Sequence, residues 1–218
     1  MHIQRCTITL HEPLFFATRE IGRLYETGRY LHNYALTYAL GRTQSPWFHA
    51  EQVPHYAQDL GELCEQVYVT PAAPEQVTFQ LATFKYGEEE LHVEMQQAER
   101  NTPSFGRAKE LAPESTFVCY VMSEQKLPLP RWVRLGKWHS KALAEYSDVA
   151  WKLSDGEYRA ASPLNPLDVP AGTFRAFDIV SMPPSSLVAN ARCVGPHYAL
   201  APGLGLPLDL AYRFPGSQ

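Results

Sequence analysis

Apolar and polar residues alternate along the start of the chain, which is the pattern of a half-buried β-strand. Over residues 3–10 the apolar side consists of Cys6, Ile8 and Leu10, and the residues between them are polar. The later runs QVYVT, VTFQLATFKYG and LHVEM alternate in the same way. The run TFVCYVM is apolar on both sides, which is typical of a strand in the middle of a sheet.

Residues 19–41 have a different pattern, with an apolar residue at every third or fourth position. This spacing predicts a helix within residues 20–40 that ends at Gly41, since glycine commonly closes a helix in the left-handed conformation. A single helix would project from its polar face Arg19, Arg23, Glu26, Tyr30, Asn33 and Thr37. A second interpretation stays open, because Gly28 costs about 1 kcal/mol inside a helix. Thr27 and Gly28 would then form a turn between two shorter pieces.

The second half of the chain is rich in proline. Prolines dominate from residue 163 onward, and the 218 residues contain 18 of them, above the usual level of about 5%. We therefore expect long proline-rich loops on a frame of strands. Residues 131–146 are expected to form extended chain, a turn at Gly136 and extended chain again. One strand, one principal early helix and then many strands predict the α+β class.

Composition narrows the class of protein. The 45% of hydrophobic residues suffice for a substantial core. The four cysteines are spread singly, so we expect neither a disulfide framework nor a zinc site. Cys6 and Cys119 lie in apolar strands and are predicted to be buried free thiols in a reducing compartment. The sequence contains neither a signal peptide nor a membrane span, which predicts a cytoplasmic protein without membrane contact.

The polar residues of the 19–41 stretch carry the first candidate chemistry. Three arginines, four tyrosines, His32 and Asn33 occur within these 23 residues. Arginine forks match phosphate oxygens, tyrosines stack on unpaired bases, and His32 and Asn33 carry groups that read base edges. Together they predict a surface for single-stranded RNA. The competing interpretation is the solvated face of an ordinary amphipathic helix.

Residues 131–142, RWVRLGKWHSKA, are the second candidate. They hold four lysines and arginines, two tryptophans and no acid. Cations interleaved with aromatics around a glycine suit a groove that follows an RNA backbone. If residues 137–141 are extended, Lys137, His139 and Lys141 share one face. An exposed edge strand, protected from aggregation by its lysines, is the alternative.

The remaining motifs are weak. The run APGLGLPL places Gly203 and Gly205 where a backbone could approach a phosphate, but it lacks a Walker lysine. A connection before a final strand is the better interpretation, and no nucleotide cofactor is expected. His49 and His55 flank Glu51 at a spacing that matches no standard metal site, and no catalytic signature is present.

The two candidate stretches resemble a known family. The segment LFFATREIGRLYETGRYLHNYALTYALG, residues 14–41, closely resembles the opening of the small Cas-five-type subunit of type I-D CRISPR Cascade. The segment WVRLGKWHSK is similar to the basic, glycine-centred strand of repeat-associated RNA-binding proteins of this kind. The length and the proline-rich carboxyl half also fit, so the resemblance covers the whole chain.

The resemblance implies a ferredoxin-like (RRM-like) β-α-β-β-α-β core with an antiparallel sheet, an inserted β-hairpin or thumb, and long proline-rich loops. It implies one Cas-five-type domain over residues 1–218. The core strands and helix would lie in 1–125, and the basic strand and proline-rich part in 126–218. The aromatic signature of an ordinary RRM is not visible in the sequence. RNA would therefore be held by the helix, the loops and the basic strand.

The resemblance also implies a non-catalytic, RNA-binding subunit of an interference complex that caps the five-prime handle of the guide (CRISPR) RNA. Its implied partners are the large type I-D Cascade subunit, the first repeating backbone subunit and the target DNA duplex near the protospacer-adjacent motif. The charge distribution fits such a role, since residues 51–120 hold 12 acidic and 4 basic side chains and the remainder 11 and 15. One local polyanion site and separate protein surfaces are compatible with this division.

The candidate RNA-binding residues in the matching blocks are Arg19, Arg23, Tyr25, Arg29, Tyr30, His32, Asn33, Arg134, Lys137, His139 and Lys141. We expect no catalytic residue, no metal and no cofactor. The alternative is a metal-independent endoribonuclease that processes CRISPR repeat RNA, in which His32 or His139 acts with Lys137, Lys141 or Tyr146. A structural adaptor without RNA contact is a third interpretation.

Overall fold

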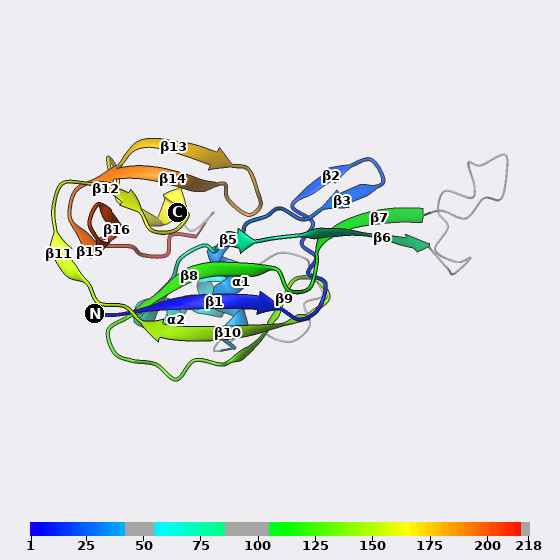
Figure 1. Ribbon diagram of the computed structural model, residues 1–218, viewed down its shortest axis with the longest axis horizontal. Helices are drawn as coiled ribbons and strands as arrows, with labels where there is room; N and C mark the ends of the chain where they lie inside the picture. The colour runs from blue at the N-terminus through cyan, green and yellow to red at the C-terminus, as the bar shows by residue number, and fades with distance from the viewer. Residues whose placement is uncertain (42–54, 86–104, 215–218) are drawn as a thin grey trace.

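The computed structural model describes residues 1–41, 55–85 and 105–214, and Figure 1 shows them as strands with a few short helices. The predicted strand LHVEM and the pair His49 and Glu51 lie outside the described residues. Almost all neighbouring strands are antiparallel, and they form three sheets. The fold is therefore mostly antiparallel β-sheet with few helices.

The first sheet forms the frame of the molecule, with strand order β4-β8-β1-β10-β9 and β5 attached to β8. Its strands are β1 (His2–Leu10), β4 (Val67–Val69), β5 (Ala73–Gln76), β8 (Thr116–Ser123), β9 (Trp132–Leu135) and β10 (Ser140–Asp148). The predicted strand at residues 3–10 is confirmed, with Cys6, Ile8 and Leu10 buried. The doubly apolar run in β8 lies between β1 and β4, as expected for a central strand.

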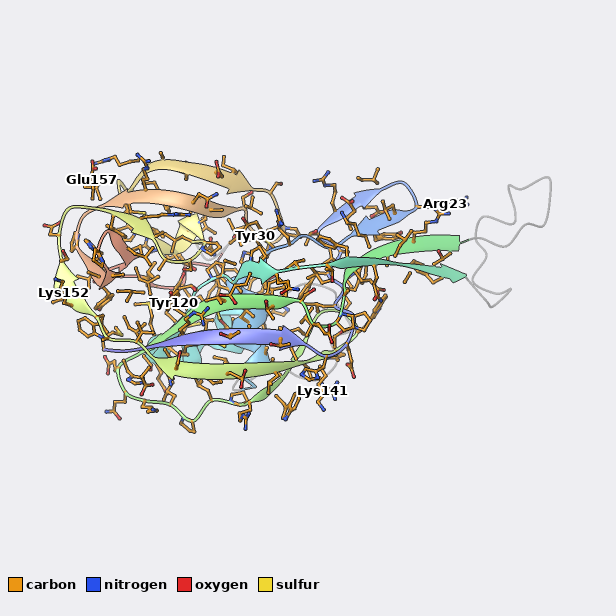
Figure 2. All side chains as sticks on the ribbon, in the orientation of Figure 1. Arg23, Tyr30, Tyr120, Lys141, Lys152 and Glu157 are labelled. Atoms are coloured by element: carbon orange, nitrogen blue, oxygen red, sulfur yellow. The ribbon has the colours of Figure 1, made fainter. Side chains whose placement is uncertain are left out.

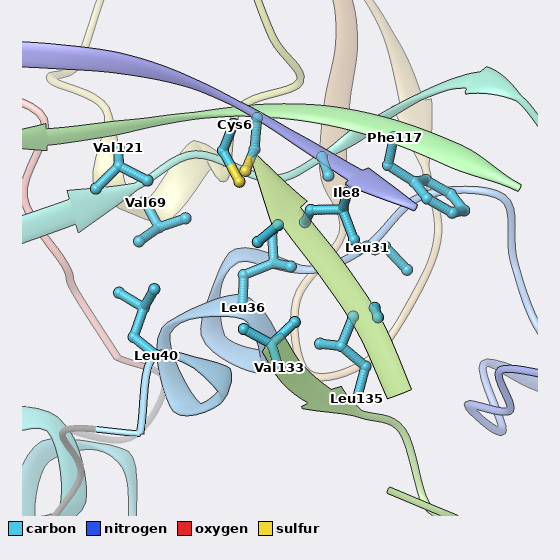
Figure 3. Close-up of a cluster of buried hydrophobic side chains, with 14 of the residues drawn as sticks. Cys6, Ile8, Leu31, Leu36, Leu40, Val69, Phe117, Val121, Val133 and Leu135 are labelled. Atoms are coloured by element: carbon cyan, nitrogen blue, oxygen red, sulfur yellow. The ribbon is translucent and has the colours of Figure 1, made fainter. Parts of the chain in front are cut away.

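Two helices, α1 (Asn33–Ala39) and α2 (Tyr56–Gln66), lie in sequence between β1 and β4. Figure 3 shows Leu36 of α1 and Leu40 directly after this helix in a cluster of apolar side chains, which also contains Ile8 of β1. Cys6 and Cys119 are buried free cysteines in this cluster, as predicted. The helix α1 ends at Ala39 with Leu40 as its C-cap, and Gly41 adopts the expected left-handed conformation with φ +69°.

The interpretation of residues 20–40 as one helix is wrong over its first half, and the alternative of two shorter pieces divided at Thr27 and Gly28 is closer to the structure. Residues 19–26 form a hairpin of β2 (Arg19–Ile21) and β3 (Leu24–Glu26), with a turn at Gly22. This hairpin pairs through β3 with β7 (Phe105–Leu111), a strand about eighty residues away in the sequence. Pairing with a distant strand overrides the helical spacing, because local propensity is only a weak preference. The helix α2 was not predicted from the sequence.

The hairpin completes a four-stranded sheet of order β2-β3-β7-β6, in which β6 is Phe79–Lys85. Only the β3–β7 pair in this sheet is parallel. Figure 1 shows the four strands projecting from the first sheet as an elongated arm. We call this sheet the arm.

The proline-rich part forms a third sheet where long irregular loops were expected. Its strands are β11 (Lys152–Ser154), β12 (Glu157–Ala160), β13 (Phe174–Val180), β14 (Leu187–Val194), β15 (His197–Ala201) and β16 (Leu204–Pro207). The described prolines of this part lie in connections, such as the cis pair Pro183-Pro184 between β13 and β14, or at a strand end, as Pro207 does in β16. Proline lacks a backbone donor and is disfavoured inside central strands, so it marks strand ends more than absent strands. The expected connection at Gly203, before β16, is confirmed.

The first sheet uses both of its faces to build the core. Its second face packs on the third sheet, β11 to β16, which we call the carboxyl-terminal sheet. There Ile3, Val118 and Tyr120 contact Tyr198 and Leu206. Alternation along β1 sends Cys6, Ile8 and Leu10 towards α1 and Ile3 towards this sheet. The carboxyl-terminal sheet is thereby fixed beside α1, and the connection between β13 and β14 reaches the region described next.

Candidate nucleic-acid interface

The turn between β9 and β10 brings the two candidate stretches together. A Cβ atom on Gly136, whose φ is +73°, would lie 2.5 Å from Leu14 Cδ1 and 2.6 Å from the Phe15 carbonyl oxygen. The next residue, Lys137, donates its N–H to that carbonyl oxygen at 2.9 Å. The rings of Phe15 and Trp138 stack with centroids 4.8 Å apart and planes 28° apart. Glycine is therefore required, because any side chain would separate the turn from the segment at Leu14 and Phe15 on which it packs.

A hollow of about 480 Å³ lies between this turn and the arm, and we call it the aromatic groove. Phe15 and Trp138 line it from the turn, and Tyr25 and Phe84 line it from the arm. The Phe84 ring lies across Gly106 on the neighbouring strand, where an added Cβ would come within 2.5 Å of Cζ. Trp138 keeps 51% of its surface exposed, although it is one of the largest apolar side chains. The groove thus offers ring faces to the solvent.

A second hollow of about 390 Å³ adjoins the aromatic groove, because Ala17 and Lys137 line both. Its walls include four tyrosines, so we call it the tyrosine cleft. The tyrosines are Tyr30, Tyr34, Tyr38 and Tyr56, and they face the connection at Met182, Pro183 and Pro184. Figure 2 shows Tyr30 between the arm and the carboxyl-terminal sheet. Lys137 is the one lysine or arginine among the described residues that line either hollow.

His32 lines the tyrosine cleft, but both of its ring nitrogens are occupied. Nδ1 accepts the N–H of Tyr34 at 3.2 Å and so caps α1, which leaves the proton on Nε2 to be donated to Ser185 Oγ at 3.0 Å. Burial lowers the pKa of His32 to about 4, and the hydrogen bond with Ser185 opposes that shift. The ring is therefore neutral near pH 7 and has no free nitrogen for a base edge.

Asn33 is fully buried, which corrects the expectation that it projects from the helix. Its Nδ2 donates to Asp168 Oδ2 at 2.8 Å, and its Oδ1 accepts from Asn165 Nδ2 at 3.5 Å. Asp168 also accepts from the Tyr68 hydroxyl at 3.0 Å and from the Arg213 N–H at 2.9 Å. We call this network the buried junction. Thr37, also expected outside, is fully buried and donates to the Asn33 carbonyl at 2.8 Å.

The buried junction changes the acidity of its carboxyl group. Burial raises the pKa of Asp168 to about 6, although its hydrogen bonds with Arg213, Asn33 and Tyr68 favour the charged form. Burial also raises the pKa of Tyr68 well above its usual value. Asn33 thus joins the first sheet's helix to the carboxyl-terminal sheet, and no part of its amide reaches the solvent.

The arginines of the hairpin do not face the aromatic groove. Arg19 Nε lies 3.7 Å from Glu26 Oε2, and Lys109 Nζ lies 3.5 Å from Glu26 Oε1. Since neighbouring residues of a strand face opposite sides, Tyr25 turns to the groove and Arg19 to the outer face of the arm. Arg23 lies in the turn between β2 and β3, where Figure 2 shows it on the arm. Arg29 is exposed in the segment between β3 and α1.

The basic stretch forms β9, a turn and the start of β10, which confirms the expected order of extended chain, turn at Gly136 and extended chain. The extended conformation considered for residues 137–141 is wrong. Residues 136–139 form the turn, and His139 has a left-handed backbone with φ +53°. Arg134 Nη1 donates to the His139 carbonyl oxygen at 3.1 Å and to Glu12 at 3.4 Å. Lys141 places Nζ 4.1 Å from the centre of the Trp132 ring. Lys137 therefore does not share one strand face with His139 and Lys141.

Four of the predicted residues line the two hollows: Tyr25, Tyr30, His32 and Lys137. Sequence reasoning missed Phe15, Phe84, Tyr56 and the wall at Met182. Phe15 precedes the hairpin within the apolar run LFFA, and Trp138 stands two residues after the turn glycine. An apolar pair beside a turn glycine was the available signal for the stacked rings.

Two further properties concern the described residues. No cluster of three or more His, Cys, Asp or Glu side chains in residues 1–41, 55–85 and 105–214 is arranged to hold a metal ion. In the same ranges, no helix has the length and apolar character needed to cross a membrane.

Comparison with known families assigns the chain first to a class, the CRISPR-associated proteins. More narrowly, the family described as Type I-D CRISPR-associated protein Cas5/Csc1 matches residues 1–215, and the chain belongs to this family. The resemblance in residues 14–41 is thereby confirmed. Members of this family are part of a CRISPR RNA-guided complex, which confirms the prediction that the chain is a component of a CRISPR effector.

The other comparisons find only low sequence identity or no match. Among solved structures, the chain is similar to one in a type III-B Cmr-beta complex bound to cognate target RNA and AMPPnP. The TM-score is 0.49 and the identity 11%, with 88% of this chain and 86% of that chain covered. A comparison with curated proteins gives no match.

Proposed function

We propose that this chain is a non-catalytic RNA-binding subunit of a type I-D CRISPR interference complex. In this role it caps the five-prime handle of the guide RNA and acts in the cytoplasm. Family membership supports the setting. The position of Lys137 supports the RNA contact, because this exposed cation lies where the aromatic groove and the tyrosine cleft meet.

The physical basis is a combination of stacking and charge. A base stacked on an aromatic side chain is stabilised by about 1–3 kcal/mol, largely regardless of base type. The exposed Trp138 ring is held flat by Phe15 and so loses little freedom on binding. Lys137 then neutralises a phosphate between neighbouring bases. Rings grouped with a cation suit single-stranded nucleic acid, and the phosphate would lie on the Lys137 side of the groove, away from the Glu20 carboxylate that also lines it.

We assign the protein partners to other surfaces. The outer face of the arm combines Arg19 and Lys109 with Ile21 and Leu81, which are 52% and 58% exposed. Exposed apolar residues beside arginine are typical of protein interfaces. We propose that this face contacts the first repeating backbone subunit. The large subunit and the target DNA duplex near the protospacer-adjacent motif would meet the remaining surfaces.

The order of four strands supports a ferredoxin-like core as part of this proposal. The order β4-β8-β1-β10, with α1 between β1 and β4 in sequence, has β1 antiparallel to both of its neighbours. Residues 124–139 between β8 and β10 are described and contain no helix, so the second helix of a β-α-β-β-α-β unit is replaced by a loop and β9. The arm would correspond to the implied thumb.

We propose further that the chain does not cut RNA. Two groups considered for cleavage are engaged elsewhere: both ring nitrogens of His32 are bonded, and the Tyr146 hydroxyl donates to the Pro130 carbonyl oxygen at 3.0 Å. Burial also raises the pKa of Tyr146, which opposes its use as a base. Cleavage at the 2′-hydroxyl needs a group that is free to take a proton.

The test is binding of a labelled five-prime-handle RNA to the purified chain, followed by fluorescence anisotropy without metal. Trp138→Ala should weaken binding by about tenfold, the equivalent of about 1.4 kcal/mol. Leu153→Ala is the matched control, because Leu153 is an exposed apolar residue on β11, remote from the arm. For the wild type, affinity should fall with salt by about 0.7 logarithmic units per unit of log salt for each phosphate contacted.

Three outcomes would overturn the proposal. Equal affinities of Trp138→Ala and Leu153→Ala for the RNA would show that it does not bind at the aromatic groove. An affinity that does not change with salt concentration would show the same. The same reactions run on a gel should contain intact RNA. Site-specific fragments that vanish in His139→Ala would make the chain an endoribonuclease.

A further inference from the structure

We propose that the tyrosine cleft takes one unpaired nucleobase, turned out of the RNA strand that lies in the aromatic groove. This inference rests on the proposed function and deepens it. The two hollows share Ala17 and Lys137, so a strand that crosses this point can leave its phosphate at the lysine. The cleft then lies on one side of that phosphate and the stacked Trp138 on the other.

The size and the lining of the cleft suit a flat, uncharged group. Its volume of about 390 Å³ is within the range of small-ligand sites. Tyr30, Phe16 and Met182 contribute rings and a thioether, and sulfur makes favourable contacts with aromatic groups. A phosphate inside the cleft would be costly to desolvate with one lysine at the edge. The base therefore enters and the phosphate stays outside.

Four polar side chains of the cleft wall are already bonded within the protein: Thr18, His32, Tyr34 and Tyr38. The Tyr38 hydroxyl donates to Asp59 Oδ2 at 2.7 Å, and the Tyr34 hydroxyl donates to the Arg213 carbonyl oxygen at 3.1 Å. The Thr18 hydroxyl donates to the Glu26 carbonyl oxygen at 2.9 Å and accepts the Gly28 N–H at 2.8 Å. The wall thus presents ring faces with few directed groups. We infer that it selects a planar base with little preference for which base.

The cleft is formed jointly by the two ends of the fold. Met182, Pro183 and Pro184 come from the carboxyl-terminal sheet, and the residue that follows them, Ser185, is bonded to His32 of the amino-terminal half. Ser185 also donates to Asn165 Oδ1 at 3.2 Å, which links this wall to the buried junction. The wall is therefore held in place before a ligand arrives. A preformed site avoids the cost of ordering a loop on binding.

The base is favoured over an apolar side chain of a protein partner by the cation at the mouth. Lys137 is exposed and lines both hollows, and the bond from its backbone N–H to the Phe15 carbonyl oxygen fixes the point from which its side chain starts. An apolar side chain would gain no electrostatic stabilisation from this charge. A nucleotide places a phosphate within a few ångströms of its base, which matches the arrangement.

The experiment uses a set of five-prime-handle RNAs, each with 2-aminopurine at one successive position, and the full chain. Stacking quenches this fluorescent base. We expect one position whose quenching is lost in Met182→Ala and in Tyr30→Ala and is kept in Trp138→Ala. Replacing that nucleotide by an abasic one should weaken binding roughly 5- to 100-fold, and exchanging its base should change binding by less than about threefold. Tyr30→Phe and Met182→Leu, which keep the ring and the apolar bulk, should bind like the wild type.

The results separate this inference from the proposed function. If Trp138→Ala weakens binding but no position responds to Met182→Ala or Tyr30→Ala, the cleft holds no base and the groove alone binds RNA. If no variant of either hollow changes binding, the proposed function fails as well. If an abasic nucleotide at each position in turn left the affinity for the wild-type chain unchanged, the cleft would likewise hold no base.

Discussion

The aromatic groove and the buried junction draw on the same stretch of sequence, yet they have opposite roles. Tyr25 lines the aromatic groove, and Asn33, eight residues later, is completely buried against Asp168. Both residues have the chemistry to contact a nucleotide. Their fates differ because Asn33 meets a carboxylate 135 positions away in the sequence. The kind of residue alone therefore does not identify a binding site.

The two regions also differ in what their polar groups contribute. At the buried junction, the Asn33 amide and the Tyr68 hydroxyl that donate to Asp168 belong to buried residues, so the loss of their acceptor costs the full desolvation of these donors. At the groove, Lys137 and Trp138 are exposed and their removal leaves water in their place. Changes at the junction should therefore reduce the free energy of unfolding, and changes at the groove should reduce affinity for RNA.

Asp168→Ala is the strongest test of this division. The substitution leaves the Asn33 amide, the Tyr68 hydroxyl and the Arg213 N–H without their acceptor. We expect the free energy of unfolding to fall by about 3–5 kcal/mol, as when one partner of a buried polar pair is removed. Urea denaturation followed by circular dichroism measures it. Asp155→Ala is the control, since Asp155 is exposed and bonds to Gly156 beside it, and we expect a change within about 0.5 kcal/mol.

A second test uses pH, because folding shifts the pKa of Asp168 at the buried junction and the pKa of the nearby His32 in opposite directions. The pKa of His32 is lowered to about 4, so its contribution to stability is present above its ordinary value of 6.5 and is lost as pH falls through 4. The pKa of Asp168 is raised to about 6, so its contribution is present below 3.8 and is lost as pH rises through 6. Between pH 4 and 6 the two slopes offset each other in the wild type.

His32→Asn separates the two slopes while keeping an acceptor at the start of α1, since asparagine is a favoured N-cap. Between pH 7 and pH 4 the wild type should lose about 3 kcal/mol relative to the variant. The variant alone should become less stable as pH rises from 4 to 6, because only Asp168 then titrates. Urea midpoints at four pH values measure both curves. Parallel curves for the two proteins would show that His32 does not change its proton affinity on folding.

The sequence was sufficient for the parts that local pattern determines. The alternation in residues 3–10 predicted β1, Gly136 predicted the turn, and Gly41 predicted the end of α1. It was insufficient where distant pairing decides. Residues 19–26 form a hairpin because β3 pairs with β7, and the helical spacing of their apolar residues gave no sign of that partner.

The carboxyl-terminal sheet and the tyrosine cleft were missed for a related reason. Prolines were counted as loop residues, although they separate short strands such as β13 and β14. The cleft combines residues near positions 16, 30, 56 and 183, which only the packed fold brings together. The candidate residues from the single stretch 19–41 therefore identified only part of the tyrosine cleft. Lys137 was identified because its cation stood beside a turn glycine that could be recognised.

The smallest expected effect distinguishes two cations that were equal candidates from the sequence. Lys137→Gln removes a charge at the junction of the two hollows, and Arg19→Gln removes one from the outer face of the arm. We expect Lys137→Gln to weaken binding of the five-prime-handle RNA about fivefold, the size of an exposed charge contact near 1 kcal/mol. Its salt dependence should also decrease by about 0.7, the loss of one phosphate contact. For Arg19→Gln we expect less than a twofold change, because the side chain faces away from the groove and lies beside Glu26.

Lys152→Gln serves as the matched control, since Lys152 is exposed on β11 and Figure 2 shows it at the end of the molecule opposite Arg23. It removes the same net charge, so any loss that it shares with Lys137→Gln reflects the overall field of the protein. Equal losses in all three variants would mean that position on the surface is irrelevant and that RNA is held by net charge. A larger loss in Arg19→Gln than in Lys137→Gln would move the RNA to the outer face of the arm. The proteins that we assign to that face would then need another surface.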